Sequence, residues 1–382
     1  IQLYNKSILP WEYLRSTSFN TVGTFNAIAI FSALLLPVIM SLFSKGKTAV
    51  KLISLAAGAF LLFLLFLINF KTAWLVLLFS AASFLCLSLP GLKNKQNYYW
   101  VVMPMVLIAV SLLFGFFDFS IFKVSAVPFE LSINQELERT IAKNVLKGKN
   151  MHFGTGPGTF VFDYVRFGAG NLSQTAIWNV RFNYGASEFL DMLITTGVMG
   201  VLPLVLIFFI FLWQGFRFLQ KAGQDQTGNQ EWILSLGLIS AFIGFFVAGF
   251  FYPLNIVLWF YFWTILGCFV AMLPGAPKSL DLKEYSMSGI VVSFLLTIAI
   301  IFSVGFMFRA AQKYAAAVKY EQGTTVASQG NIDESINLFN KSVGLDAKTD
   351  IYWQDLSQMY LQKLQKETQN TTYDKNKLYE IV

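Results

Sequence analysis

Charged residues are scarce in this chain. Asp, Glu, Lys and Arg together account for 13% of its 382 residues, whereas 55% are hydrophobic and 40 are phenylalanine. A soluble domain of this length has too little interior to bury so much apolar surface, so the composition excludes a soluble protein and indicates an integral membrane protein. The net charge of +7 does not indicate nucleic-acid binding, because the lysines collect beside the apolar segments.

Cysteine is almost absent, and no signal peptide is recognisable at the start of the chain. Both cysteines, Cys86 and Cys268, lie in apolar runs, so we expect buried thiols and neither a disulfide nor a metal site. The chain starts at Ile1 and ends at Val382 in the middle of a repeat pattern. We therefore expect further membrane spans before residue 1.

Apolar stretches of about 20 residues, the length that crosses a bilayer, recur along most of the chain. We predict about eight spans, at residues 25–43, 52–69, 72–90, 99–117, 187–214, 232–251, 255–273 and 288–308. The sequence thus predicts an all-α fold. It consists of a polytopic membrane helix bundle in residues 1–308 and a helical region in residues 309–382.

The distribution of positive charge predicts how these spans are oriented. Alternate loops carry the basic residues Lys45, Lys47 and Lys51, then Lys93 and Lys95, then Arg217 and Lys221, then Lys278 and Lys283. All of these loops fall on one side of the membrane, which the positive-inside rule assigns to the cytoplasm. The extracytoplasmic side then holds residues 1–24, the long segment 118–186 and the tail after residue 309.

The segment 118–186 is too long for an ordinary connection, and loops of that length are usually functional. Ser132 and Gln135 within it fit a capping box, the signature of a helix start. Apolar residues then recur every four positions, at Leu137, Ile141 and Val145. This pattern predicts an amphipathic helix, which lies either on the membrane surface or against the end of the bundle.

The tail after residue 309 has a different pattern. Residues 330–336, with the sequence GNIDESI, and the following Phe339 resemble the middle of a tetratricopeptide repeat. Tyr320 and Trp353 are separated by 33 positions, close to the repeat's period of about 34. Two packing positions that take small residues in that repeat hold Ser335 and Ser342.

Repeats of this kind need stacked neighbours to bury a core, so we expect more of them after residue 382. Their usual role is to bind peptides or protein partners. The alternative interpretation is a plain helical hairpin.

Many spans, one long extracytoplasmic loop and a glycine-rich motif occur together in this chain. The motif is GTGPGTF at residues 154–160, and it leads into SEFLDMLITTGVMG at residues 187–200. Together these features resemble the O-antigen ligase and O-antigen polymerase family of bacterial membrane glycosyltransferases. Gly23-Thr24-Phe25-Asn26 resembles a cluster that opens an earlier span in that family. The resemblance covers roughly residues 15–275.

The resemblance implies an activity and a location. A glycan on a polyprenyl-pyrophosphate lipid would be moved, with inversion, to the hydroxyl of a glycan or protein acceptor. The reaction would occur at the outer face of the bacterial cytoplasmic (inner) membrane, without a metal, a nucleotide sugar or another cofactor. The family's arginines in the extracytoplasmic loop are thought to hold the pyrophosphate.

Arginine suits a pyrophosphate because its planar guanidinium matches phosphate oxygens and stays charged. Arg166 and Arg181 lie between the glycine-rich motif and the following span, and Arg15 is a third candidate. Each could instead anchor the protein at the lipid headgroups. Three glycines, Gly154, Gly156 and Gly158, allow close approach of the backbone to a ligand, or a structural turn. They do not form a nucleotide-binding P-loop, because no Lys-Ser or Lys-Thr follows.

The family's catalytic base, a histidine at the span entry, has no counterpart here. Ala186 and Ser187 stand at that place, and the only histidine is His152. Glu188 is our first candidate for the base, with Asp191 one turn further along the same face. The alternatives are His152, then Asp163, or a relative that has lost catalysis.

Aromatic residues accompany these charges, namely Phe167, Trp178, Phe182 and Tyr184. They could stack on sugar rings or form the aromatic belt of a membrane interface. Two further functions stay open beside the glycosyltransferase. A transporter or flippase for lipid-linked glycans would also explain a cationic outer loop, and a non-catalytic scaffold would use the membrane bundle to present the repeats.

Overall fold

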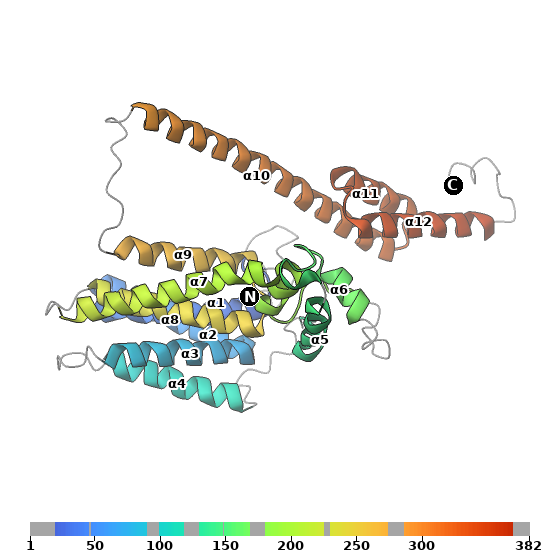
Figure 1. Cartoon of the computed structure of the whole chain (residues 1–382). Helices are drawn as coiled ribbons and strands as arrows, with labels where there is room; N and C mark the ends of the chain where they lie inside the picture. The colour runs from blue at the N-terminus through green and yellow to red at the C-terminus, as the bar shows by residue number, and fades with distance from the viewer. Residues whose placement is uncertain are drawn as a thin grey trace. The chain divides into compact units, whose positions relative to one another are not determined.

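The computed structural model describes residues 20–45, 47–89, 99–117, 130–147, 149–168, 180–224, 230–273 and 286–369. Within these ranges every regular element is a helix (Figure 1), which confirms the predicted all-α fold class. The chain divides into two compact units, Ile1–Ala276 and Pro277–Val382. The predicted domain boundary at residue 308 therefore falls inside the second unit.

Nine α-helices belong to the described part of the first unit. They are α1 (Phe25–Lys45), α2 (Thr48–Ile68), α3 (Lys71–Ser88), α4 (Tyr99–Phe116), α5 (Gln135–Leu146), α6 (Phe160–Phe167), α7 (Glu188–Gln224), α8 (Gln230–Phe251) and α9 (Ile256–Met272). The second unit contains α10 (Ser286–Ser328), α11 (Ile332–Leu345) and α12 (Asp350–Gln369).

A helix lies at each of the eight predicted spans, although the helix at 187–214 contains a non-helical residue at Gly197. Six helices among the described residues are long and apolar enough to cross a membrane, namely α1, α2, α3, α7, α8 and α10, whereas the apolar parts of α4 and α9 are shorter. These helices support a multi-pass membrane protein. The orientation of these helices in the membrane stays a prediction.

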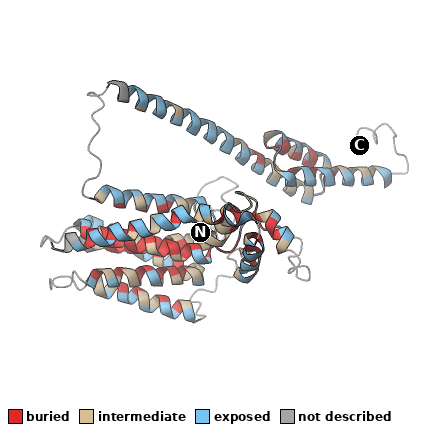
Figure 2. Cartoon of the chain, viewed as in Figure 1, coloured by how far each residue is buried: buried red, intermediate tan, exposed pale blue. Residues whose placement is uncertain are grey.

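The helix α8 forms the centre of the bundle, where it contacts α1, α3, α7 and α9. Of its most apolar window, 78% is buried, more than in any other described span (Figure 2). Phenylalanine fills this centre. The ring of Phe242 stacks on Phe211 at a centroid distance of 3.8 Å and on Phe262 at 5.4 Å. Aromatic stacking thus accounts for part of the high phenylalanine content.

Small residues let α1 and α3 approach α8 closely. A Cβ added to Gly237 would lie 2.7 Å from Ser41 Oγ, and a Cβ on Gly244 would clash with Ser80 Oγ. Close backbone approach at small residues is a common basis of helix association in membranes, where burial of apolar surface adds little.

The two cysteines correct one prediction. Cys86 and Cys268 are free, as expected, but both are exposed on the bundle surface rather than buried. An apolar run does not distinguish the lipid-facing side of a membrane helix from its buried side.

A small domain covers one end of the bundle. We call it the cap and define it as residues 130–147, 149–168 and 180–196. It has its own apolar core, which includes Leu137, Ile141 and Val145 of α5 together with Phe160, Tyr164 and Phe182.

The predicted amphipathic helix is therefore present as α5, and it packs against α6 and α7. Gln135 Nε2 also donates to Phe250 O at 3.1 Å, so α5 lies against the end of the bundle.

The start of α5 differs from the predicted capping box. Asn134 is the N-cap, and its Oδ1 accepts a hydrogen bond from Leu137 N at 2.8 Å. Ser132 lies outside the helix. The position of an N-cap depends on which short polar side chain the local backbone turns toward, and several stand close together in this segment.

The helix α7 is broken at Gly197. This residue has φ 67° and ψ −169°, values that a helix does not contain. The rings of Phe189 and Phe208 both lie against Phe246, at 5.5 Å and 4.1 Å between centroids. In a straight helix residues so far apart in sequence would be separated by about 28 Å. The chain therefore bends sharply at Gly197, and residues 188–196 form a short separate helix within the cap.

The second unit is a three-helix array. Its core is formed by Ala316 of α10, by Ile336, Phe339 and Val343 of α11, and by Tyr352, Leu356 and Met359 of α12. Ser335 and Ser342 are fully buried, and Ser335 Oγ donates to Gly323 O at 3.0 Å, as expected for small packing residues. Trp353 is half exposed, and its neighbour Tyr352 packs on Tyr320. This arrangement fits both a repeat and a plain hairpin, so the tetratricopeptide assignment stays a prediction.

Candidate active site at the cap end of the bundle

Glu188 begins α7 and connects it to the turn between α8 and α9. Its Oε2 accepts a hydrogen bond from Leu254 N at 2.7 Å, and its Oε1 accepts one from Trp259 Nε1 at 3.2 Å. Its own amide donates to Tyr252 O at 3.3 Å. Both carboxylate oxygens of the first candidate base are thus engaged in holding the bundle together.

Asp191 lies one turn further along the short helix, as the sequence predicted. Its Oδ1 is buried and has no hydrogen-bond partner among the described residues. Glu188 and Asp163 both lie within electrostatic range of this carboxylate. Asp191 therefore has an oxygen that accepts no hydrogen bond from the described residues, whereas each oxygen of Glu188 already accepts one.

Glu138 of α5 is a functional candidate that the sequence analysis missed. Its side chain is fully buried, and its Oε2 accepts hydrogen bonds from Ala186 N at 3.1 Å and Ser187 N at 3.0 Å. These two amides precede the first turn of α7, where a negative charge is favoured. The signal in the sequence was a charged residue on the apolar face of α5, in register with Ile141 and Val145.

Asp163 of α6 is held by the glycine-rich segment. Its Oδ2 accepts a hydrogen bond from Thr155 Oγ1 at 2.6 Å, and Thr155 Oγ1 lies 2.7 Å from Thr159 Oγ1. Burial raises the pKa of the Asp163 carboxyl, whereas the Thr155 hydroxyl and nearby Arg166 act in the opposite direction. Asp163 is thus the second acidic group of the cap that faces Asp191.

The glycine-rich segment fills the break in α7. Thr155 N donates to Ile194 O at 3.1 Å, and Gly156 N donates to Thr195 O at 2.8 Å. On the other side of the break, Met199 N donates to His152 O at 3.0 Å. The loop thereby satisfies the backbone groups that the break leaves without helical partners.

This arrangement explains the glycines that were predicted to approach a pyrophosphate. Gly154, at φ 65°, lies so close to α7 that an added Cβ would be 2.6 Å from Ile194 O. The amides of Gly154 and Gly156 already donate to backbone carbonyls, so they are not available to a ligand. Gly158, at φ 77°, has open space around it. The first two glycines therefore have a structural reason that does not involve a ligand.

A second polar network joins the start of α1, the cap and the turn between α8 and α9. Tyr252 OH donates to Glu130 Oε2 at 3.0 Å, and Asn26 Nδ2 donates to the same oxygen at 2.9 Å. Thr24 Oγ1 lies 2.8 Å from Tyr252 OH. The Gly-Thr-Phe-Asn motif at residues 23–26 thus contributes two of its members to the cap end of the bundle.

The remaining candidates lie at the cap surface or outside the described residues. Arg166 and Arg181 are exposed, and the Arg166 guanidinium lies 5.0 Å from the centre of the Phe167 ring. The side chain of His152 is also exposed. Phe182 is buried and packs edge-on against Tyr164, so it cannot stack on a sugar, whereas Tyr184 is exposed. Arg15 and Trp178 lie outside the described residues.

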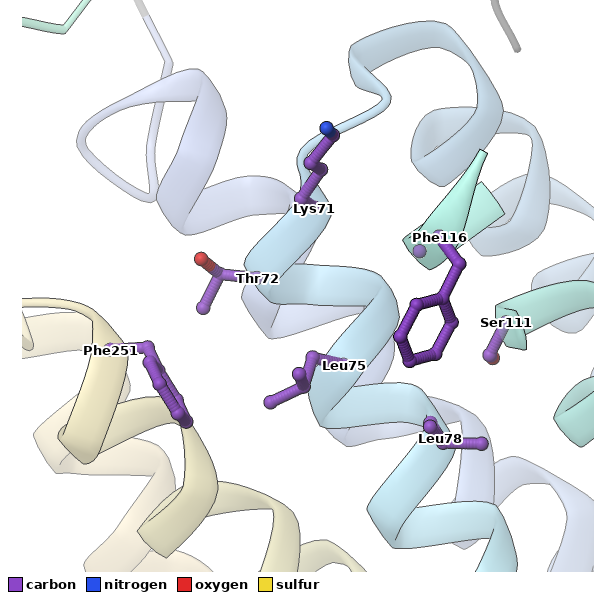
Figure 3. Close-up of a pocket in the computed structure, with 8 residues that line it drawn as sticks. Lys71, Thr72, Leu75, Leu78, Ser111, Phe116 and Phe251 are labelled. Carbon is purple, nitrogen blue, oxygen red and sulfur yellow. The ribbon is translucent and has the colours of Figure 1, made fainter. Parts of the chain in front are cut away.

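A hollow of about 160 Å³ lies between α3, α4 and α8. It is lined by Lys71, Thr72, Leu75, Leu78, Ser111, Gly115, Phe116 and Phe251. Figure 3 shows the Phe116 ring beside Leu75 and Leu78, with Lys71 at the start of α3. Phe251 immediately precedes Tyr252, so this hollow opens at the same end of the bundle as the cap.

The buried carboxyl groups of Glu138 and Asp163 and the partly buried carboxyl group of Asp191 therefore lie near one another and near the start of α7. The sequence predicted two of them and the correct helix entry. No protein-family model matches this chain, and no curated protein sequence matches it significantly, so the case for a function rests on the geometry of the cap and on the sequence motifs.

Proposed function

We propose that this chain is a bacterial membrane glycosyltransferase that moves a glycan from a polyprenyl-pyrophosphate lipid to an acceptor hydroxyl. The observation that carries the proposal is Asp191, whose Oδ1 is buried within the cap and accepts no hydrogen bond from the described residues. The motifs at residues 154–160 and 187–200 support the same class of reaction. The chemistry then takes place at the cap end of the bundle.

In the proposed reaction the acceptor oxygen attacks the anomeric carbon of the donor sugar. The new glycosidic bond forms as the bond to the phosphate oxygen breaks, and polyprenyl pyrophosphate leaves with the bonding electrons. Asp191 takes the proton of the acceptor hydroxyl. We assign this role to Asp191 rather than to Glu188, because both oxygens of Glu188 accept hydrogen bonds from Leu254 N and Trp259 Nε1.

The test uses the full-length protein in liposomes that contain a polyprenyl-pyrophosphate glycan. Release of polyprenyl pyrophosphate is followed with and without a hydroxyl acceptor. We expect release that depends on the acceptor and that matches the amount of extended acceptor formed. Movement of the donor between leaflets without release would instead support a transporter. If the donor is neither moved nor cleaved, both functions are contradicted.

The arginines of the cap supply the charge that the leaving group requires. We expect Arg166→Ala and Arg181→Ala each to raise the KM for the donor by about tenfold, since a charge-assisted hydrogen bond contributes roughly 1.5–3 kcal/mol. The change is measured by the release assay over a range of donor concentrations. Arg217→Ala, at the opposite end of α7, is the matched control and should leave the KM unchanged. An equal effect of all three substitutions would point to surface charge alone.

The hollow between α3, α4 and α8 offers the polyprenyl chain an apolar surface next to the cap. We expect Leu75→Trp, which fills the hollow, to raise the KM for a donor with a full-length chain and to leave a donor with a short farnesyl chain unaffected. Leu55→Trp on the exposed face of α2 is the control for added bulk. If both donors respond equally to Leu75→Trp, the chain does not lie in this hollow.

One observation favours the transporter as a second candidate. Discontinuous helices form the binding sites of many transporters, and α7 is broken at Gly197. In such transporters the unwound backbone binds the solute. Here Ile194 O and Thr195 O accept hydrogen bonds from the glycine-rich segment instead. The break therefore supports a fixed cap better than it supports a solute site.

A further inference from the structure

The cap contains two buried carboxylate oxygens for which the described residues provide no hydrogen-bond donor. One is Glu138 Oε1, on a side chain with no exposed surface, and the other is Asp191 Oδ1. A buried acceptor without a donor costs free energy, and a buried negative charge without a counter-charge costs more. The two carboxyl groups interact electrostatically with each other. One proton placed between them would supply the donor that both oxygens lack.

Among the residues that the structure describes, no basic group acts electrostatically on Glu138 in place of this proton. The charged side chains that act on it are Asp191 and Glu188 of α7, and both are acidic. From α6, Asp163 acts on Asp191, and Arg166 acts on Asp163 at the cap surface. Tyr164 of α6 is buried, its hydroxyl has no hydrogen-bond partner among the described residues, and its pKa is raised by burial, so it stays neutral.

We propose that Glu138 and Asp191 share one proton, and that Glu138 is thereby a positioning residue for the carboxylate of Asp191. This inference rests on the proposed function. Glu138 in its neutral form donates from Oε1 to Asp191, while its Oε2 continues to accept from Ala186 N and Ser187 N. The negative charge of the pair then resides on Asp191, whose remaining lone pairs take the proton of the acceptor hydroxyl.

The protonation of Glu138 follows from its environment. Burial raises the pKa of Glu138 to about 8, the negative charges of Asp191 and Glu188 act in the same direction, and the two backbone amides act against them. Below this pH Glu138 carries a proton. Above it Glu138 ionises, two like charges face each other, and the donor to Asp191 is lost.

The first experiment measures the rate of glycan transfer between pH 6 and pH 10. We expect the wild-type rate to fall by about tenfold for each pH unit above 8, as for a reaction that requires one protonated group. Glu138→Gln keeps an oxygen for the two amides and an N–H for Asp191, but it cannot ionise. Its rate should stay within about twofold of the neutral wild-type rate and show no fall at this pH. Glu136→Gln, on the exposed face of α5, should behave as wild type.

A fall near pH 8 that persists in Glu138→Gln would overturn the proposal.

If the wild type transfers no glycan at any pH, the proposed function fails. Infrared spectroscopy then tests separately whether Glu138 and Asp191 share a proton. The carbonyl band of a buried protonated carboxyl should disappear as the pH rises through about 8 in wild type and should be absent in Glu138→Gln. In Asp191→Asn, which removes the neighbouring charge, the band should disappear at a lower pH. An unchanged midpoint in that variant would show that the two groups are not coupled.

Discussion

Gly197→Ala is expected to lower the free energy of unfolding by roughly 4 kcal/mol or more, enough to leave little folded protein. The backbone at φ 67° and ψ −169° is accessible almost only to glycine. An added Cβ would also lie 2.5 Å from Gly154 N and from the backbone carbon and oxygen of His152. These atoms belong to the segment that fills the break in α7, so the segment would have to leave its place.

The yield of monodisperse protein in detergent and its thermal unfolding measure this effect, with the fluorescence of the nine tryptophans as the probe. Gly267→Ala is the matched control, because it lies within α9 and nothing stands within 4 Å of an added Cβ. It should be neutral or slightly stabilising. A Gly197→Ala variant as stable as this control would mean that α7 and the glycine-rich segment can separate without cost.

Asp191→Asn is expected to reduce acceptor-dependent release of polyprenyl pyrophosphate by a factor of about 100 to 10,000, the usual contribution of a general base. The side chain keeps its size, so the fold should be retained and the KM for the donor should change little. Glu188→Gln removes charge at a residue that joins α7 to Leu254 and Trp259. For that variant we expect lower thermal stability and a smaller loss of rate.

The comparison between these two variants distinguishes the two carboxyl groups. Both are measured in the same liposomes, with the amount of folded protein determined in each preparation. If Glu188→Gln were stable and lost more activity than Asp191→Asn, Glu188 would be the base, as the sequence alone suggested. A full rate in both variants would remove the acidic residues of α7 from the reaction.

Local patterns predicted most of the fold. The spans follow from apolar runs, and α5 follows from the recurrence of Leu137, Ile141 and Val145 every four residues. The polar residues at the start of α7 were found because they are neighbours in sequence. Glu188 and Asp191 therefore came together as expected. No local sequence pattern, however, could reveal that the amide of Leu254 already donates a hydrogen bond to the Glu188 carboxylate.

The features that the sequence did not predict depend on contacts between distant segments. Glu138 meets Ala186 and Ser187 across almost fifty residues, so its burial depends on how the cap folds. The break at Gly197 is visible only once residues 152–156 are seen to fill it. A run of apolar residues with a glycine is otherwise typical of a continuous membrane helix, which tolerates glycine well.

The helix α10 continues without a break from its apolar part into the three-helix array. It contains 43 residues, none of its most apolar part is buried within the second unit, and Ala316 and Tyr320 of the same helix pack into the array. A helix of that length measures about 65 Å and resists bending and twisting along its whole axis. The three-helix array is thus joined to the apolar segment by one continuous, stiff helix. If a bound molecule rotated α11 and α12, the apolar part of α10 would rotate with them in the bilayer, because α10 contains no hinge that could absorb the rotation.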